Sequence, residues 1–446
     1  MKKIGKKDRL ILGNRRKRLI LGNVILALII ACSFYIWSAG QHHSRQAVKT
    51  STEKTVTKKE EAKEKDTPGN ESAANTPEES SGQKSPARSG EGESETATPA
   101  PGFTLSMVGD VLLHGPVSRS GLQKDGSYNY DALFSHVKKD IKASDAALIN
   151  QEVILAGEKF GITGYPTFNG RFQVGDAIER AGFDVVLHAT NHAMDQGKSG
   201  LLSCLKRWEK SHPQMKIMGM YSSKKKSQKI TYVKKNGIRI AILNYTYGTN
   251  GLPLPGDMPY AVNLLSKKKI KRDVKKAKKK ADFIVVCPHW GTEYQTRPDA
   301  SQKMWCRYFL KLGVNLVIGT HPLVIQPVKW MKDHQGHRML VYYSLGNYIN
   351  ASSNRYTGMF RQFCGGMAEV KLARDPRGAV VIEEAKFIPL ITHWIKGGEI
   401  TTYRLSDYSR KKAEKNYLSV IDSGFTYEKS RKFFHKIIHR TFLSMD

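Results

Sequence analysis

The chain has 446 residues, and its 72 Lys and Arg residues outnumber its 40 Asp and Glu residues to give a formal net charge of +32. This length allows one large domain or two ordinary ones plus appendages, and the hydrophobic fraction of 40% can supply a core. So high a charge excludes a neutral cytosolic enzyme as the default class. It indicates an anionic partner such as nucleic acid, a membrane surface or an acidic polymer.

The positive charge falls in two separate parts of the chain. Residues 1–18 carry a net charge of +8, residues 19–40 carry none, and residues 41–100 carry −2. Residues 101–446 therefore hold the remaining +26. We expect the N-terminal charge to set membrane topology and the charge of residues 101–446 to select a partner.

Residues 19–39 form an uncharged apolar run, which as a helix is long enough to cross a hydrocarbon core of about 30 Å. Arg15, Arg16, Lys17 and Arg18 directly precede it, so the positive-inside rule places the N-terminus in the cytoplasm. A cleaved signal peptide has a shorter apolar region of about 7–15 residues, and the apolar residues after Cys32 fit poorly with a lipoprotein signal. We predict a cytoplasmic basic N-terminus at 1–18, a transmembrane signal anchor at 19–39, and a single-pass cell-membrane protein whose large domain is extracellular.

Residues 41–100 contain no Leu, Ile, Met, Phe, Tyr, Trp or Cys. They cannot bury enough apolar area to offset the entropy lost on ordering. We therefore predict a disordered extracellular linker over residues 40–101, which tethers the domain to the membrane.

Beyond the linker, short β-branched runs bounded by turn residues alternate with helical stretches. The runs predict strands at 103–108, 146–149, 185–187, 239–245, 283–287, 316–318 and 339–343. Helical patterns lie between them at 175–181, 200–210, 267–280 and 301–312. This alternation predicts an α/β fold with a largely parallel or mixed sheet.

Metal-ligating residue types follow several of these runs. They are Asp110, Glu152, Asn191, His192, His289 and His321. Ligands bind at the carboxyl ends of strands in open α/β sheets, and carboxylate, amide and imidazole groups suit a divalent metal. Each residue alone also has a structural interpretation, such as a helix cap at Asn191 or a tight turn at 319–322 that contains His321. Together they predict one or two divalent ions, Mn, Zn, Fe or Mg, with Glu152 able to bridge two ions and His192 able to protonate a leaving group.

Six motifs in this order carry a family resemblance: Gly109-Asp110, Asn150-Gln151-Glu152, Ala189-Thr190-Asn191-His192-Ala193-Met194-Asp195-Gln196-Gly197, His289-Trp290-Gly291-Thr292-Glu293-Tyr294, Gly319-Thr320-His321-Pro322 and Tyr343-Ser344-Leu345-Gly346-Asn347-Tyr348. They resemble the CapA/PgsA family of poly-γ-glutamate capsule proteins, which looks like a branch of the calcineurin-like metallophosphoesterase superfamily. The resemblance covers residues 103–389. It implies a metallophosphoesterase-like layered α/β sandwich, which we place at residues 102–395.

The resemblance also implies roles for individual residues. The implied metal ligands are Asp110, Glu152, Asn191, His289 and His321. His192 falls at the position of the acid or oxyanion-stabilising histidine, and we take His192 and Asp110 as the catalytic pair. We further expect substrate contacts from Trp290, Glu293, Tyr294 and Asn347.

Three positions depart from the family pattern. Leu323 replaces the second histidine of a His-Pro-His motif, and a leucine cannot ligate a metal, so one of two metal positions is weakened or lost. Thr190 replaces an asparagine that is expected to lie behind the ligands, and Gln151 replaces a leucine, which indicates a packing change. His114 can substitute for the missing histidine if its loop folds inward, although a surface position is the simpler expectation.

Two function hypotheses follow. In the first, the protein is a membrane-anchored subunit of a poly-γ-glutamate synthesis and export complex, with the membrane, the other synthetase subunits and the anionic polymer or cell wall as partners. In the second, it is an anchored metal-dependent phosphoesterase or related hydrolase that acts on cell-envelope substrates. Nucleic acid is not expected as a partner, because the domain is predicted to lie outside the cell.

Two basic segments bear on the choice of partner. The stretch 267–280 holds ten basic residues and one acid, which fits a solvated helix face or a polyanion-binding surface. We treat residues 396–446 as a C-terminal extension, in which 429–442 alternates basic and apolar residues at helical spacing. That helix packs on the domain or contacts the membrane surface or a partner.

Overall fold

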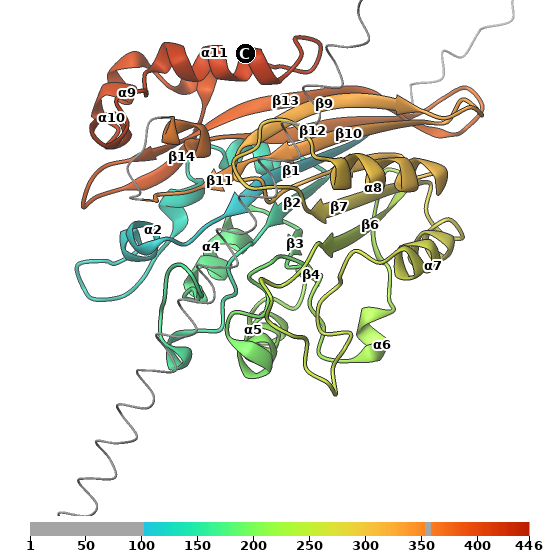
Figure 1. Cartoon of the computed structure of the whole chain (residues 1–446), viewed down its shortest axis with the longest axis horizontal. Coiled ribbons are helices and arrows are strands. Elements are labelled where there is room, and N and C mark those ends of the chain that lie inside the picture. The colour runs from blue at the N-terminus through green and yellow to red at the C-terminus, as the bar shows by residue number, and fades with distance from the viewer. Residues whose placement is uncertain (1–101, 353–357, 446) are drawn as a thin grey trace, which may run out of the picture. The chain divides into compact units, whose positions relative to one another are not determined.

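The computed structural model describes residues 102–352 and 358–445 (Figure 1). The predicted cytoplasmic N-terminus, signal anchor and linker lie outside these described residues. Within residues 102–352 and 358–445, none of the helices has both the length and the apolar character needed to span a bilayer.

The strands of the described residues form two mixed sheets. The first sheet has the order β14-β13-β12-β1-β2-β3-β4, and β11 also pairs with β1. Its strands are β1 (Phe103–Val111), β2 (Ala146–Asn150), β3 (Val185–Leu187), β4 (Lys216–Met218), β11 (Asn347–Ile349), β12 (Cys364–Arg374), β13 (Val380–Trp394) and β14 (Ile400–Arg404). Strands β1 to β4 are parallel neighbours, whereas β12, β13 and β14 join antiparallel.

The second sheet has the order β5-β6-β7-β8-β10-β9. Its strands are β5 (Thr231–Lys235), β6 (Ile238–Thr246), β7 (Phe283–His289), β8 (Leu316–Ile318), β9 (Ile325–Lys332) and β10 (Arg338–Leu345). The central strands β6, β7, β8 and β10 are parallel, and β5 and β9 close the two edges antiparallel.

Helices and short turns connect and flank the strands of the described residues. The α-helices are α2 (Gly115–Ser120), α3 (Lys138–Lys142), α4 (Gln173–Ala181), α5 (Gly197–Ser211), α6 (Lys224–Ser227), α7 (Lys267–Ala277), α8 (Ala300–Lys311), α9 (Arg410–Lys415), α10 (Leu418–Ile421) and α11 (Tyr427–Ile437). Short 3₁₀ turns are η1 (Asp131–Phe134), η2 (Glu158–Phe160), η3 (Met359–Phe363) and η4 (Leu405–Asp407). The seven predicted strands and four predicted helical stretches are all present, which confirms the α/β fold.

Alternation along β6 shows how the layers pack. Ile240 and Ile242 belong to the larger core, which also contains side chains of the first sheet. The alternate residues Ala241, Leu243 and Tyr245 face the other way and pack in a smaller core with residues that include Ile270 of α7 and Phe309 of α8. Because successive strand residues point to opposite faces, a strand buried on both faces reads as one continuous apolar run. The second sheet therefore lies between the first sheet and the helices α7 and α8.

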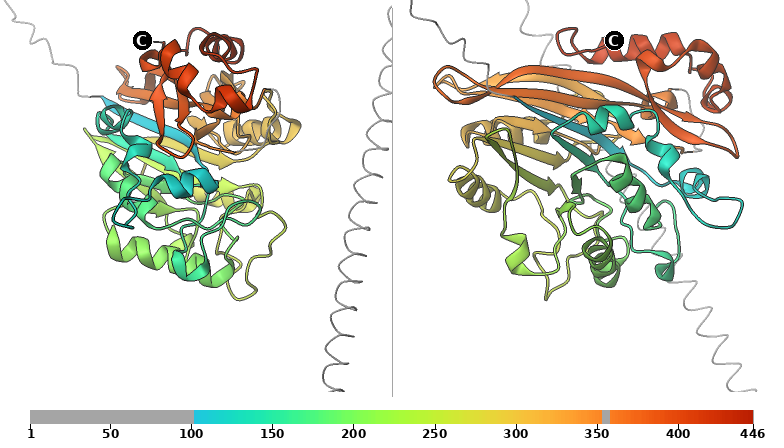
Figure 2. Two further views of the ribbon diagram at one scale, coloured as in Figure 1. Left: turned by 90° about the vertical axis from the view of Figure 1, so that its left-hand side faces the viewer. Right: turned by 180° about the vertical axis from the view of Figure 1, so that it is seen from behind.

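The C-terminal part of the chain is continuous with the first sheet. The boundary expected after residue 395 falls in the turn between β13 and β14, which are hydrogen-bonded neighbours. Helix α11 buries Phe433 and Phe434 in the larger core, with the Phe434 ring 6.3 Å from that of Phe387 in β13. Figures 1 and 2 show the red C-terminal helices over β13. Of the two alternatives for the amphipathic helix, packing on the domain is confirmed.

One buried histidine ties the stability of this fold to pH. His188 follows β3, and its Nε2 accepts a hydrogen bond from Trp208 of α5 at 3.1 Å. Burial lowers the pKa of His188 to about 3. Between about pH 6.5 and 3, His188 therefore binds a proton in the unfolded chain but not in the folded chain. Within this range, His188 lowers the free energy of unfolding by about 1.4 kcal/mol for each pH unit of acidification.

We expect the His188→Gln variant, which keeps an acceptor for Trp208, to lose about 2 kcal/mol less stability than the parent between about pH 7 and pH 5. Urea unfolding midpoints of both proteins at the two pH values measure the difference. Equal losses in the two proteins would contradict a neutral buried His188.

Candidate metal centre

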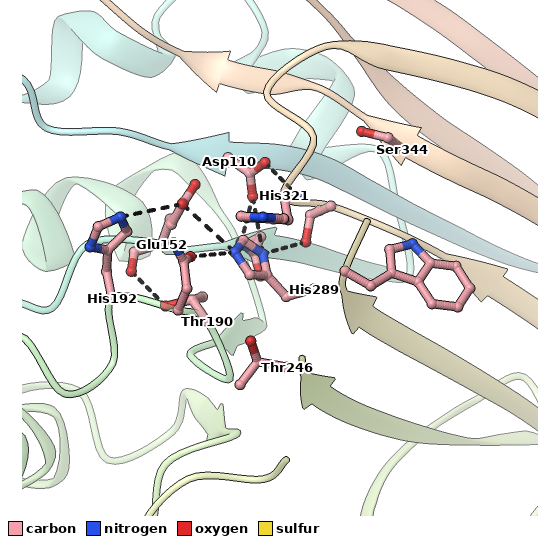
Figure 3. A network of polar contacts seen from close by, with 12 residues as sticks. Asp110, Glu152, Thr190, His192, Thr246, His289, His321 and Ser344 are labelled. Carbon is pink, nitrogen blue, oxygen red and sulfur yellow. Dashed lines mark hydrogen bonds and ion pairs between the residues drawn. The ribbon is translucent and has the colours of Figure 1, made fainter. Parts of the chain in front are cut away.

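The candidate ligands come from both sheets. Asp110 lies near the end of β1 and His289 ends β7, whereas Glu152, Asn191 and His321 follow β2, β3 and β8. Because the parallel strands of each sheet run the same way, their carboxyl ends meet at one edge. Figure 3 shows Asp110, Glu152, His289 and His321 converging, with Glu152 between His192 and His289.

Three buried residues form the group best placed to hold an ion. One ligand atom from each of Glu152, His289 and His321 lies within 4.8 Å of the other two. The Oε2 atom of Glu152 and the Nδ1 atom of His321 are buried without a hydrogen-bond partner. Unpartnered buried acceptors are costly, and a divalent cation would satisfy both. The donor set therefore fits a metal.

Asp110 lies beside this group and also holds neighbouring elements in place. Its Oδ1 accepts a hydrogen bond from Asn150 at 2.7 Å and lies 3.7 Å from Nδ1 of His289. Its Oδ2 accepts a hydrogen bond from the backbone N–H of His321 at 3.0 Å. Asp110 thus links β1 to the loop that carries His321, and its role as a ligand stays a prediction.

His289 is oriented on both ring nitrogens. Its Nε2 lies 2.8 Å from Oδ1 of Asn191, and its Nδ1 lies 2.9 Å from the hydroxyl of Thr320. The Asn191 amide in turn donates to Oδ1 of Asn250 at 3.2 Å. Such partners fix the orientation of a ligating imidazole.

Burial shifts the protonation of the carboxyl and imidazole groups in opposite directions. Burial, reinforced by the charge of Glu152, raises the pKa of Asp110 well above its usual value, and burial raises the pKa of Glu152 to about 8. Burial also lowers the pKa of His289 and of His321 well below the usual range. The imidazoles of His289 and His321 are therefore held in the neutral form, which is the form that ligates metal, and burial disfavours the charged form of both carboxyl groups.

His192 stands between this group and solvent. Its Nδ1 lies 2.7 Å from Oδ2 of Asp195, and its Nε2 lies 3.9 Å from Oε1 of Glu152. Burial alone would lower the pKa of His192, but the hydrogen bond to Asp195 and the charge of Glu152 outweigh burial and raise the pKa. The ring of Phe168 packs edge-on at 4.7 Å. His192 is thus an oriented imidazole with a raised pKa beside the metal group.

The structure explains the positions that depart from the family pattern. Leu323 is buried in a loop where both His321 and Leu323 have positive φ, +98° and +60°, a conformation that is strained for residues other than glycine. The hydroxyl of Thr190 donates to the backbone carbonyl of Glu152 at 2.8 Å and so supports a ligand from behind. The Gln151 side chain is buried and donates to a backbone carbonyl, so it has a packing role.

A cavity of about 1160 Å³ opens onto the metal group. Its lining includes Glu152 and His192 at the base, together with the predicted substrate contacts Glu293 and Tyr294. His114 also lines it, with its ring 5.2 Å from that of Phe168, so its loop folds inward rather than lying on the surface. His114 is not part of the three-residue group.

Two predicted substrate contacts have structural positions instead. Trp290 is buried in the smaller core and donates from its indole to the backbone carbonyl of Tyr343 at 3.0 Å. Asn347 is buried in β11 and donates to the backbone carbonyls of Leu323 and Gln362. Neither lines the cavity, so the structure gives both residues packing roles and does not support the predicted substrate contact.

Two further residues at the site lie outside the six motifs. Tyr247 is partly exposed with its ring 4.6 Å from that of His321, and Asn250 holds Asn191. Both follow the end of β6. Both are polar residues that follow a predicted strand, as the candidate ligands do. The strand that ends at Tyr245 therefore carries the signal that indicates them.

Comparison with known proteins gives consistent matches. The model of the family described as bacterial capsule synthesis protein PGA_cap matches residues 104–352. The PGA biosynthesis protein CapA of Bacillus subtilis (strain 168) is 29% identical over 264 residues, 55% of this chain and 63% of the relative. The capsule biosynthesis protein CapA of Bacillus anthracis is 29% identical over 257 residues, 55% of this chain and 59% of the relative. The chain thus spans about three fifths of the length of these curated relatives.

Similar solved structures include a putative 5'-nucleotidase from Staphylococcus aureus, with a TM-score of 0.40 and 14% identity over 64% of this chain and 54% of that chain. A 5'-nucleotidase precursor from Thermus thermophilus has a TM-score of 0.39 and 16% identity over 75% of this chain and 59% of that chain. The family match covers more than half of the sequence and agrees with the resemblance expected from the six motifs. The protein therefore belongs to the bacterial capsule synthesis protein family PGA_cap.

Proposed function

We propose that the protein is a membrane-anchored extracellular subunit of a poly-γ-glutamate synthesis and export complex, and that its domain binds one or two divalent ions. Family membership and the names of the two Bacillus relatives support the capsule role. The predicted signal anchor and linker support the location. The partners in this proposal are the membrane, the other subunits of the synthetase and the anionic polymer or cell wall.

The observation that carries the metal centre is the buried group Glu152, His289 and His321, which has unpartnered acceptor atoms and of which Glu152 lines a large cavity. These residues would hold the ion, and Asp110 and Asn191 would keep them in position or complete the ligand set. A bound divalent ion supplies Lewis-acid stabilisation of negative charge on a substrate oxygen. Leu323 supports a single strong metal position over two.

The same site favours a second candidate function, an anchored metal-dependent phosphoesterase or related hydrolase of the metallophosphoesterase type acting on envelope substrates. Asp195 holds the Nδ1 atom of the His192 ring. The Nε2 atom of His192 therefore faces Glu152, and both residues line the cavity. A protonated imidazole in this position can give its proton to a leaving-group oxygen, a role that typically accelerates a reaction by about 10²–10⁴-fold. The two functions are compatible within one subunit.

A basic surface supports an anionic partner. Helices α6 and α7 lie side by side, joined where Lys269 donates to the carbonyl of Ser227 at 3.1 Å. The exposed lysines of this α6–α7 surface are Lys224, Lys225, Lys226, Lys267, Lys268, Lys271, Lys275 and Lys276. The acid within α7, Asp273, is buried and bonded to Tyr245, Lys269 and Arg272. An emerging polyanion would be attracted here in a salt-dependent manner.

Loss of the gene for this chain is expected to remove most poly-γ-glutamate from the cell surface. Cells that instead produce the full chain with His192→Ala are expected to show at least about a tenfold change in the amount or length of surface polymer, because the proton donor is lost. Polymer is measured by gel electrophoresis of surface extracts.

The matched control is His435→Ala, which removes an exposed histidine of α11 and should leave the polymer unchanged. Unchanged polymer in cells without the gene would contradict the capsule role. Normal polymer with His192→Ala would contradict the hydrolase candidate alone and leave a binding subunit.

A further inference from the structure

The cavity over the metal group has two cationic side chains on its lining. Arg119 belongs to α2, and Lys396 belongs to the turn between β13 and β14, yet both line the same cavity as Glu152 and His192. Figures 1 and 2 show α2 and the β13–β14 turn at the same end of the domain. Both side chains are exposed, and neither forms an ion pair with a carboxylate of residues 102–352 or 358–445. Two cations are thus available to a ligand.

The lining of the cavity also carries large aromatic and aliphatic side chains that are exposed. Tyr165, Leu122 and Tyr294 line it with 78%, 53% and 51% of their surface exposed. Trp394 and Tyr417 form another part of the cavity lining. Their rings pack edge to face, with the ring centres 4.8 Å apart. Exposed large apolar side chains gathered at one opening mark a binding site rather than ordinary surface.

Lys396 is placed by this aromatic wall. Its ammonium lies 5.2 Å from the centre of the Tyr417 ring, a cation–π contact that holds the charge without neutralising it. Arg119 offers a planar fork of donors that matches the two oxygens of a carboxylate or phosphate. The two cations therefore present different donor geometries to an anion.

We propose that Arg119 and Lys396 are the anion-recognition residues of this cavity, and that they bind negative groups of an extended ligand whose less polar stretches lie against Tyr165, Tyr294 and Trp394. The ligand carries repeated carboxylates or phosphates, because both fit the fork of Arg119 and the charge of Lys396. This inference rests on the proposed function, since it assigns substrate recognition to the cavity beside the metal group. The negative groups of the ligand are opposite in charge to Arg119 and Lys396, whereas the acidic residues of the lining, Glu152 and Glu293, are left to the metal side of the cavity.

The test measures binding of two labelled probes, a γ-linked glutamate oligomer and a polyphosphate of matched charge, to the full chain. The salt concentration is about 0.15 M, at which distant exposed lysines are strongly screened. Each of Arg119→Ala and Lys396→Ala should weaken binding of the preferred probe by about tenfold, and the double variant by about 100-fold, as expected for hydrogen bonds to charged groups. The probe that binds more tightly identifies carboxylate or phosphate as the recognised group.

The control is the double variant Lys432→Ala and Lys436→Ala, which removes the same charge from the exposed side of α11, outside the cavity. Arg119→Lys keeps the charge but loses the fork, and should fall between the parent and Arg119→Ala. Equal weakening by the control pair, or binding within about twofold of the parent for the Arg119 and Lys396 pair, would overturn the inference.

Metal content of the same samples separates this inference from the proposed function. The Arg119 and Lys396 variants should retain the divalent ion while losing the probe. Loss of both the ion and the probe in these variants would mean that the site has collapsed and would count against separate anion-recognition residues. Absence of an ion from the parent, with normal dependence of probe binding on Arg119 and Lys396, would contradict the proposed metal centre and leave the cavity assignment standing.

Discussion

The full chain with His321→Ala is expected to lose its divalent ion, with affinity reduced by about 100-fold or more. His321 supplies one of three buried ligand atoms and has a ring nitrogen with no other partner among the described residues. Residues that only hydrogen-bond to metal ligands typically contribute about 10–100-fold to metal affinity. Loss of a ligand itself should therefore lower the affinity further. Metal content after dialysis, measured by inductively coupled plasma mass spectrometry, reports the loss.

His334→Ala is the matched control, because His334 is exposed between β9 and β10. The control should keep the ion content of the parent. Added metal should also raise the unfolding free energy of the parent by about 2.7 kcal/mol at about 100 times the dissociation constant, and this gain should vanish with His321→Ala. Equal metal content in His321→Ala and the parent would contradict the assignment of the group.

Phe434→Ala is expected to destabilise the domain by about 3–5 kcal/mol, the usual cost of removing a fully buried aromatic ring. Phe434 has no exposed surface and packs against Phe387 of β13 and Phe433 of its own helix. Truncation of the ring leaves a cavity between α11 and the first sheet. The midpoint of guanidinium unfolding, followed by the fluorescence of buried tryptophans, measures the loss.

The matched control, Lys436→Ala, changes a residue on the exposed side of α11 and should alter stability by no more than about 0.5 kcal/mol. An unchanged midpoint for Phe434→Ala would mean that α11 unfolds separately from the sheets. In that case the alternative role of this helix, at a membrane surface or a partner, would regain support.

The strand-end rule predicted most of the site because it depends on local sequence. His289 closes an apolar run, and its position at the edge of the sheet follows from the strand alone. The same strand shows why Trp290 faces away from the site: Phe283, Val285 and Cys287 face the larger core, whereas Ile284, Val286 and Trp290 share the smaller one. Neighbouring residues face opposite sides, so His289 turns to the site and Trp290 to α8.

The rest of the domain depends on pairings between distant segments. Nothing local distinguishes β12 and β13 as the strands that extend the first sheet beyond β1, because their antiparallel pairing is fixed by tertiary packing. Arg119 and Lys396 likewise look like ordinary surface cations in the sequence. They share a cavity only because the β13–β14 turn returns to the end of the domain that carries α2.

The hydrogen bond from the His321 backbone to Asp110 joins residues 211 positions apart. The ligand set of a folding chain therefore stays incomplete until β8 has docked beside β7. Closing so long a segment is a late, slow step in folding. If the domain binds an ion as proposed, folding and loading with the ion are consecutive events, and the supply of metal would then set how much finished domain accumulates.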